Sequence, residues 1–354
     1  MTIGTVPLIE VHGPPRERGR QQGEAARQFA ASMVDAYQRI APGATGSSWE
    51  MARDRAQELL PPSEAAFPAY MEELRGLAEG AGLAFEDVWL LNCYEELETS
   101  AGLTACTSLA VRGELTAGGH VLLAHNEDWI SFDREHVYLL RSEPEGEPPF
   151  LGFTFGALLP NIGFNAEGVA VAINSVYPTD ECLGVPRLVF SRAVLAARTI
   201  GEAIARCVFD GRAGGYNYLL ADENGELYCV ETSALEHDVI YADEGWIAHT
   251  NHYLSPKMQA VEQPGAYAGS IVRLNRARRL LWEGLGGVEV VDLQGILRDH
   301  VNHPRSICGH EDVSQPAHER GQTVLSLVMD LNERSMWVAP GPPCEGEYVE
   351  YRLG

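Results

Sequence analysis

The chain has 354 residues, of which 45% are hydrophobic and 21% are charged, the composition of an ordinary globular protein. Its 26 basic and 50 acidic residues give a formal net charge of −24, which argues against nucleic acid and anionic lipid as partners because both need a basic surface. No apolar run approaches the ~20 residues of a membrane span, and no basic region followed by an apolar run indicates a secretion signal.

The first hundred residues are predicted to be largely helical. Residues up to about 12 alternate weakly and are predicted to form an edge strand, and a helical pattern then runs from Pro14 to about Ile40. Within it, Gly19 and Gly23 share one helical face, which either allows another element to approach closely or marks a loosely packed helix start. A second helix is predicted from about Trp49 to Leu60, where Pro61 and Pro62 break it. Further helices are predicted from about Glu64 to Gly80, with Ser63 as the cap, and from Glu86 to about Thr99.

From Thr104 onward the pattern changes to short strands. Residues 106–111 and 120–125 are predicted to pair through a Gly118-Gly119 turn. Further strands are predicted at 137–141, 150–155, 161–164, 169–174, 216–221, 227–232, 239–241, 246–250, 323–330 and 336–339, and helices at 186–197, 200–209, 270–282 and 292–300. This order predicts one integrated α+β domain, with two antiparallel sheets face to face beneath outer helical layers.

Cys106 stands where the helical segment gives way to the strands. If the peptide bond between Ala105 and Cys106 is cleaved, Cys106 becomes a new N-terminus that carries a thiol and an α-amino group on one residue. The amino group has a pKa of about 8 and can take the thiol proton, which an amide nitrogen cannot do. The alternative is a small buried cysteine on a strand, the usual environment of a free cysteine.

Other polar residues follow predicted strands. Pairing would bring Asp128 near Cys106, where a carboxylate could orient the α-ammonium group; the alternative is a solvated turn. The side-chain amide of Asn251 could donate to the oxyanion of a tetrahedral intermediate. His249 and His252 leave a metal site as an alternative, as do Cys308 and His310, although neither pair has further ligands at a suitable spacing.

These motifs, in this order, resemble the acyl-coenzyme A:6-aminopenicillanate acyltransferase family, a self-processing cysteine branch of the N-terminal-nucleophile hydrolases. The resemblance spans nearly the whole chain. Cys106-Thr107-Ser108 is similar to the Cys-Thr-Thr cleavage site of the family, and Asn126-Glu127-Asp128 to its Asn-Trp-Asp element. Thr250-Asn251-His252 matches its Thr-Asn-His motif, and residues 16–23 and 162–171 resemble its opening glycine motif and a Gly-Phe-Asn-x-x-Gly-Val-Ala-Val segment.

The resemblance implies an αββα sandwich and a precursor that is cut into an α chain, residues 1–105, and a β chain, residues 106–354, which remain associated. It implies Cys106 as the nucleophile in self-cleavage and turnover, Asp128 as the active-site aspartate and Asn251 as the oxyanion asparagine, with Thr107 and Ser233 in supporting or processing positions. No metal and no cofactor are expected; the expected partner is a small N-acyl amine or acyl donor, with a coenzyme A thioester as a candidate co-substrate.

The sequence departs from the family pattern at two positions. Ala105 precedes the nucleophile where the acyltransferase has glycine, and Gly309 follows Ser306-Ile307-Cys308 where it has arginine. Arg305 or His310 could supply the missing charge. A separate basic segment contains Arg273, Arg276, Arg278 and Arg279, which form either a groove for coenzyme A or a solvated helix face.

The sequence therefore predicts a self-processing cysteine amidohydrolase or acyltransferase that acts through a Cys106 thioester. Seven scattered cysteines without a C-x-x-C pair favour reduced thiols and a cytoplasmic location. Two alternatives stay open: a binding protein on the same fold that has lost catalysis, for which the Gly309 departure is the reason, and a zinc-dependent hydrolase.

Overall fold

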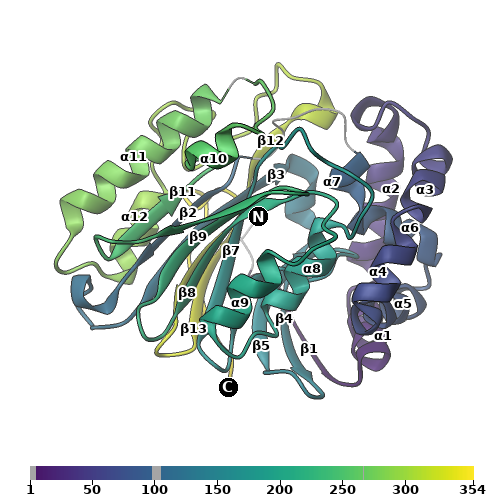
Figure 1. The fold of residues 1–354 in the computed structure, drawn as a ribbon, viewed down its shortest axis with the longest axis horizontal. Coiled ribbons are helices and arrows are strands. Elements are labelled where there is room, and N and C mark those ends of the chain that lie inside the picture. The colour runs from purple at the N-terminus through teal and green to yellow at the C-terminus, as the bar shows by residue number, and fades with distance from the viewer. Residues whose placement is uncertain (1–4, 98–104, 266) are drawn as a thin grey trace.

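The computed structural model describes residues 5–97, 105–265 and 267–354 (Figure 1). Two β-sheets lie face to face at its centre, and helices cover their outer faces. Within the described residues the larger sheet has eight strands in the order β1-β4-β5-β6-β7-β8-β9-β10, and the smaller has six in the order β11-β2-β3-β12-β13-β14. None of the helices in these ranges is long and apolar enough to span a bilayer.

The larger sheet consists of β1 (Leu8–Gly13), β4 (Val137–Pro144), β5 (Phe150–Phe155), β6 (Ile162–Asn165), β7 (Val169–Ser175), β8 (Tyr216–Asp222), β9 (Leu227–Thr232) and β10 (His237–Tyr241). The smaller sheet consists of β2 (Thr107–Val111), β3 (Leu122–Ile130), β11 (Trp246–His249), β12 (Gly321–Asp330), β13 (Ser335–Pro340) and β14 (Val349–Arg352). The helices are α1 (Pro15–Ala25), α2 (Arg27–Ala44), α3 (Trp49–Gln57), α4 (Leu60–Ala66), α5 (Pro68–Ala81), α6 (Phe85–Asn92), α7 (Tyr94–Leu97), α8 (Arg187–Val194), α9 (Ile200–Cys207), α10 (Pro256–Gln259), α11 (Ala268–Gly284) and α12 (Val290–Leu297).

The layers follow from which faces are apolar. Helices α11 and α12 cover the smaller sheet, and Leu109 and Leu122 of the sheet share an apolar cluster with Leu274 and Leu293 of the helices. Helices α8 and α9 pack on the side of the larger sheet, and α1 lies against its edge at β1. The predicted α+β, αββα arrangement is confirmed, with one difference: β1 pairs with β4 in parallel, so that the larger sheet is antiparallel except at this edge.

The glycines of the first helix serve close packing, as one of the two interpretations predicts. A Cβ atom on Gly19 would lie 1.9 Å from the carbonyl oxygen of Glu73, and one on Gly23 would lie 2.2 Å from that of Leu77. Helix α5 has glycines at the facing positions: Cβ atoms added to Gly76 and Gly80 would lie 2.0 and 2.1 Å from carbonyl oxygens of α1. The two backbones therefore touch where only glycine fits.

Several predicted boundaries are wrong, each for a local reason. Pro61 and Pro62 do not break a helix: they stand in the first turn of α4, where the N–H that proline lacks has no helical partner. Ser63 lies inside α4 and donates its hydroxyl to the carbonyl of Leu59 (2.7 Å) instead of capping the next helix. The helix predicted from Glu86 is divided into α6 and α7, and its last residues lie outside the described ranges. Strands β2 and β3 pair as predicted, but residues 112–121 connect them and include a short 3-10 helix at Gly113–Leu115, in place of a two-residue turn at Gly118-Gly119. Strand β14 is not among the predicted strands.

Candidate active site

Cys106 and Asp128 are positioned by the pairing of β2 with β3. Strand β3 runs on to Ile130, so residues 126–129 are buried strand residues and not a solvated turn. The register places Thr107 opposite Asn126 and Ser108 opposite His125. Because side chains alternate along a strand, Glu127 lies on the face toward the main core, and Asp128 lies on the face toward α11 and α12.

The main-core side of this strand pair borders a cavity. The cavity holds about 570 Å³ of empty space, part of it open to solvent. Most of its wall is apolar or aromatic, and Cys106, Glu127, Glu95 and Ser175 provide polar groups. The apolar lining residues are Met33, Tyr37, Leu91, Tyr94, Trp129, Phe155, Leu158, Leu159, Ile173, Leu188 and Tyr216. A small molecule with an apolar portion therefore fits this wall, with its polar portion toward the thiol.

The thiol of Cys106 is buried, with 2% of the residue exposed. It donates to Oε2 of Glu127 (3.5 Å) and lies 4.0 Å from the carbonyl oxygen of Asp128. Burial, followed by the negative charges of Glu127 and Asp128, raises the pKa of Cys106 well above its usual value. The thiol of the uncut chain is therefore protonated at neutral pH, and it needs a base before it can act as a nucleophile.

Glu127 is a site residue that the sequence did not single out. It occupies the middle position of the Asn-Glu-Asp element, where the acyltransferase family has tryptophan. His125 Nε2 lies 2.8 Å from Glu127 Oε2, and His125 Nδ1 lies 2.8 Å from the hydroxyl of Ser108. The one available signal was the two-residue period of β3, which places Glu127 on the same face as His125.

The carboxyl group of Asp128 is enclosed on the other side of the strand. Its Oδ1 accepts from the hydroxyl of Thr323 (2.5 Å), and its Oδ2 is buried with no hydrogen-bond partner among the described residues. Burial raises the pKa of Asp128 to about 8, although the charge of Arg273 and the Thr323 bond oppose this shift. A Cβ atom on Gly309 would lie 2.9 Å from Oδ2, so a side chain at position 309 would press against this carboxyl group.

Asn251 connects the site to α11. Its Nδ2 donates to the carbonyl of Ser175 (3.0 Å), and its Oδ1 accepts from Nη2 of Arg273 (2.7 Å). Arg273 is buried, with 2% of the residue exposed, so it belongs neither to a basic groove nor to a solvated face. Its position beside Leu274 and four residues before Ala277, on the apolar face of the helix, was the signal that could have found it.

The other three arginines of that segment are not gathered into a groove. Arg276 pairs with Asp299 (2.7 Å), whereas Arg278 and Arg279 are exposed. Burial lowers the pKa of Arg273, while Asp128 and Cys106 are the nearby charges that raise it. The buried guanidinium group thus lies within electrostatic range of both predicted catalytic side chains.

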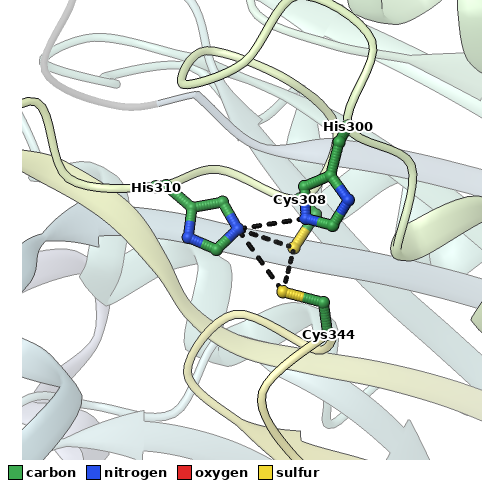
Figure 2. Close-up of side chains that lie close together, drawn as sticks. All are labelled: His300, Cys308, His310 and Cys344. Atoms are coloured by element: carbon green, nitrogen blue, oxygen red, sulfur yellow. Dashed lines mark hydrogen bonds between the residues drawn. The ribbon is translucent and has the colours of Figure 1, made fainter.

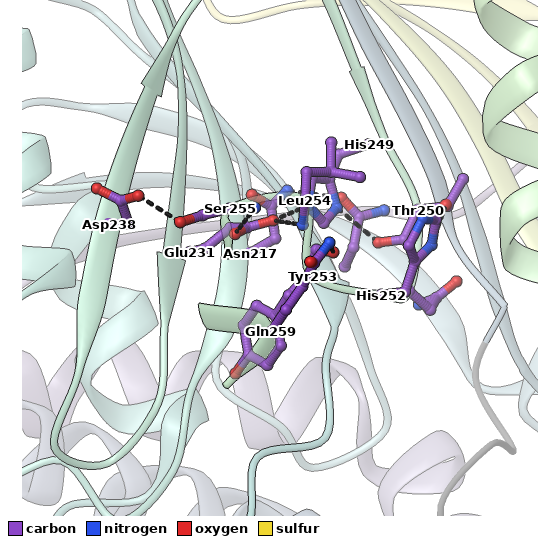
Figure 3. Close-up of polar contacts among 12 residues, drawn as sticks. Asn217, Glu231, Asp238, His249, Thr250, His252, Tyr253, Leu254, Ser255 and Gln259 are labelled. Carbon is purple, nitrogen blue, oxygen red and sulfur yellow. Dashed lines mark hydrogen bonds and ion pairs between the residues drawn. The ribbon is translucent and has the colours of Figure 1, made fainter. Parts of the chain in front are cut away.

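The two histidines around Asn251 do not converge on a metal site (Figure 3). His249 Nε2 lies 2.7 Å from Glu231 Oε1, and His249 Nδ1 lies 2.7 Å from the carbonyl oxygen of Thr250. Glu231 also accepts from the backbone N–H groups of Leu254 and Ser255, which fixes the loop after β11 (Figure 3). His252 Nδ1 lies 2.7 Å from the hydroxyl of Ser270. These histidines position the loop that carries Asn251.

The remaining candidates occupy different places. Thr107 is buried at the start of β2 beside Cys106. Ser233 follows β9, where its hydroxyl donates to Asp180 (2.7 Å) and accepts from the N–H of Glu236 (2.9 Å). Arg305 is exposed, and His310 lies next to Cys308 and Cys344. Ala105 is half-buried and is the first described residue after the gap at residues 98–104.

Comparison with known proteins decides the family. The family model for acyl-coenzyme A:6-aminopenicillanic acid acyl-transferase matches residues 115–344, more than half of the chain. The chain belongs to this acyl-transferase family. Within the family it is 26% identical over 345 residues to the acyl-coenzyme A:6-aminopenicillanic-acid-acyltransferase 40 kDa form of Emericella nidulans, covering 95% of this chain and 92% of the relative.

Two further similarities are to proteins named as hydrolases. The chain is 27% identical over 193 residues to the beta-alanyl-dopamine/carcinine hydrolase of Drosophila melanogaster, covering 47% of this chain and 49% of that protein. Among solved structures, variant R18L of conjugated bile acid hydrolase from Clostridium perfringens matches with a TM-score of 0.49 and 13% identity, over 70% of this chain and 97% of the other.

Proposed function

We propose that the protein is a self-processing cysteine amidohydrolase in which Cys106, freed by cleavage after Ala105, is the nucleophile. The observation that carries the proposal is the position of the Cys106 thiol. It lies in the wall of the cavity, and Cys106 is the first residue after the proposed cut. Membership of a family of acyltransferases, together with similarity to amide hydrolases, supports this reaction class.

The proposed reaction has two steps that share one thioester. The thiol of Cys106 attacks the carbonyl carbon of an N-acyl amine; the freed α-amino group takes the thiol proton and returns it to the leaving amine. Water then attacks the thioester, which releases the carboxylic acid and restores the thiol. In the uncut chain the thiol donates to the Glu127 carboxylate, which we propose as the base for self-cleavage, while burial and two nearby carboxylates hold the pKa of the thiol high. Cleavage then adds the α-amino group as a base on the nucleophile's own residue.

The two other proposed site residues have different roles. Asn251 is the proposed oxyanion donor; in the uncut chain its Nδ2 donates to Ser175, so this hydrogen bond must be exchanged for one to the substrate. Asp128 is enclosed on the face of β3 that is turned away from the thiol, and with a pKa of about 8 it is largely protonated at neutral pH. We propose that it supports the site by holding β3 beside Cys106 through its hydrogen bond with Thr323. Arg273 holds the side-chain oxygen of Asn251 and thereby orients its amide nitrogen.

The wall of the cavity supports an apolar acyl group. Aromatic and aliphatic side chains surround the space next to Cys106, whereas the arginines proposed for coenzyme A are buried, paired or scattered. We therefore propose an N-acyl amine with an apolar acyl group as the substrate class, with water as the preferred acceptor. Transfer from a coenzyme A thioester to an amine is the alternative within the same mechanism.

The first experiment is intact-mass analysis of the purified full chain and of Cys106→Ala. We expect wild type to separate under denaturing conditions into residues 1–105 and 106–354, and Cys106→Ala to remain one inactive chain. Cys182→Ser, which changes an exposed cysteine, should be cut like wild type. Cut Cys106→Ala protein would refute the mechanism; an uncut wild type with an unreactive Cys106 would favour the binding-protein alternative.

The second experiment separates substrate classes. Processed protein is incubated with amides whose acyl group is aromatic, aliphatic or amino-terminated, and the acyl-thioester is trapped by acid quenching and located by peptide mass. We expect the adduct on Cys106 with apolar acyl groups. Preference for an amino-terminated acyl group would contradict the apolar assignment, and faster reaction with a coenzyme A thioester plus an amine would assign the protein to acyl transfer.

A further inference from the structure

A second cluster of reactive side chains lies outside the catalytic cavity (Figure 2). It consists of His300, Cys308, His310 and Cys344, whose ligand atoms all lie within 4.8 Å of one another. The sequence presents Cys308 and His310 as a pair without partners. Folding brings His300, which follows α12, and Cys344, which follows β13, to the same point. We infer that these four residues bind a structural zinc ion.

Four of the six separations between the ligand atoms are close to those of a tetrahedral site. Zn–S bonds of about 2.3 Å and Zn–N bonds of about 2.0–2.1 Å give ligand-to-ligand separations of about 3.3–3.8 Å. Nε2 of His310 lies 3.5 Å from Sγ of Cys308, 3.4 Å from Sγ of Cys344 and 3.1 Å from Nε2 of His300. The two sulfur atoms are 3.6 Å apart. One ion at the centre replaces these four contacts with four bonds.

The chemistry of the ligands selects the metal. Two thiolates and two neutral imidazoles in a tetrahedron are the donor set typical of zinc, and two thiolate charges balance Zn²⁺. Binding releases the two thiol protons to solvent. The two sulfurs stand well beyond the ~2.05 Å of a disulfide. Four protein ligands leave no open position for substrate, so this is not the site of a zinc-dependent hydrolase.

The surroundings supply what a metal site needs beyond its ligands. Nδ1 of His310, the ring nitrogen away from the cluster, lies 3.8 Å from Oε1 of Glu345, which is too long for a hydrogen bond but places a carboxylate near the outer side of the ring. The backbone N–H of Cys308 donates to the carbonyl of Asp299 (3.0 Å), and that of His310 donates to the carbonyl of Pro304 (2.9 Å). The backbone therefore already holds both residues in place.

The metal would fix the segment that encloses Asp128. Gly309 lies between two of the proposed ligands; its N–H donates to the hydroxyl of Thr323 (2.9 Å), which in turn donates to Asp128. The zinc ion would thus join the α12–β12 connection to the loop after β13 and hold Gly309 against Asp128. Its role is structural, since the four ligands do not line the cavity.

The test measures metal in untagged, full-length protein purified without chelator. We expect about one zinc per chain by elemental analysis. After exchange of zinc for cobalt, we expect thiolate-to-cobalt charge-transfer absorption and the strong visible bands of a tetrahedral ion. Absence of both metal and cobalt spectrum in a folded protein, or a Cys308–Cys344 disulfide found by peptide mapping of freshly purified protein, would overturn the inference.

Matched variants locate the ion. Cys344→Ser changes an exposed loop residue and should lose the zinc and the charge-transfer band, whereas Cys182→Ser and His303→Ala should keep both. Cys106→Ser tests the only other candidate group in the described ranges, formed by Cys106, His125 and Glu127, and should also keep the zinc. Zinc retained in Cys344→Ser, or lost in Cys106→Ser, contradicts the assignment. Circular dichroism of each variant verifies that it is folded.

Discussion

At the scale of single residues, Asp128 combines complete burial with an incomplete set of hydrogen bonds. Only Oδ1 has a hydrogen-bond partner among the described residues. The charge of Arg273 lowers the pKa of Asp128 by less than burial raises it. A carboxyl group in this setting holds its proton far above the usual pH range of an aspartate. The residue therefore couples the charge state of the site to the stability of the fold.

This coupling predicts a specific dependence of stability on pH. The pKa of Asp128 is about 8 in the folded chain and near ~3.9 in an unfolded one, so the folded state keeps a proton that the unfolded state releases between these values. The free energy of unfolding contributed by this group must then fall as pH rises from about 4 to about 8.

The measurement is urea denaturation at several pH values in the Cys106→Ala background, which we expect to remain one chain. Asp128→Asn should be less sensitive to pH than its parent across that interval, because an amide does not titrate. Asp243→Asn, an exposed position, should follow the parent. If the curves of Asp128→Asn and the parent run parallel, the carboxyl group is not held protonated by the fold.

At the scale of elements, the contact between α1 and α5 depends on four interlocked glycines. A methyl group on Gly19 would meet a backbone oxygen at 1.9 Å, which no change of rotamer can relieve. We expect Gly19→Ala to lower the free energy of unfolding by about 1–3 kcal/mol, the usual cost of overpacking.

Gly295 provides the matched control for this prediction. It is also a helical glycine, in α12, but an added Cβ would have no heavy atom within 4 Å. Gly295→Ala should therefore stabilise the fold by up to about 0.5–1 kcal/mol, because alanine is the better helix former. Denaturant unfolding of both variants decides: equal effects would mean that the α1–α5 contact does not require glycine.

Local patterns sufficed for most elements but not for all boundaries. The order of helices and strands follows from periodicity, and so does the pairing of β2 with β3 that brings Cys106 beside residues 126–129. The predicted turn at Gly118-Gly119 is wrong, because Val111 pairs with Leu122 and residues 112–121 connect the two strands. The errors at Pro61 and Ser63 arise because proline suits a first helical turn as well as a break. Successive side chains of β3 point to opposite faces of the sheet, so the thiol of Cys106 donates its hydrogen bond to Glu127 and not to the side chain of Asp128.

The sequence proposes site residues where they share a strand pair or a motif. Cys106, Asp128 and Asn251 are proposed from sequence, whereas Arg273 was interpreted as part of a groove or surface because its burial depends on packing of α11 against the sheet. Cys344 lies 36 residues from Cys308, so no spacing rule could join them. Contacts that form only through tertiary packing leave no local pattern in the sequence from which they could be predicted.

At the scale of the whole molecule, the proposed cut divides the covalent chain but not the core. One apolar cluster contains side chains from both sides of residue 105, including Leu74 and Trp89 before it and Phe150 and Phe190 after it. Buried Glu73 bonds Arg18 of its own segment (2.7 Å) and Arg192 of α8 (3.4 Å), so a desolvated ion network also crosses the cut.

Because apolar contacts dominate this interface, the two chains should stay together after cleavage and co-elute in size exclusion at high salt, which weakens only exposed charges. Glu73→Gln should cost about 3–5 kcal/mol, since buried Arg18 then loses its carboxylate partner while Arg192 keeps Glu147 (3.1 Å), and the chains should then separate at lower urea. Glu79→Gln, which removes an exposed partner of Arg16, should leave the separation point unchanged. Dissociation of the wild-type chains in salt alone would contradict this prediction. It would show that exposed charges hold the two chains together, and not the apolar core and the buried pair of Glu73 and Arg192.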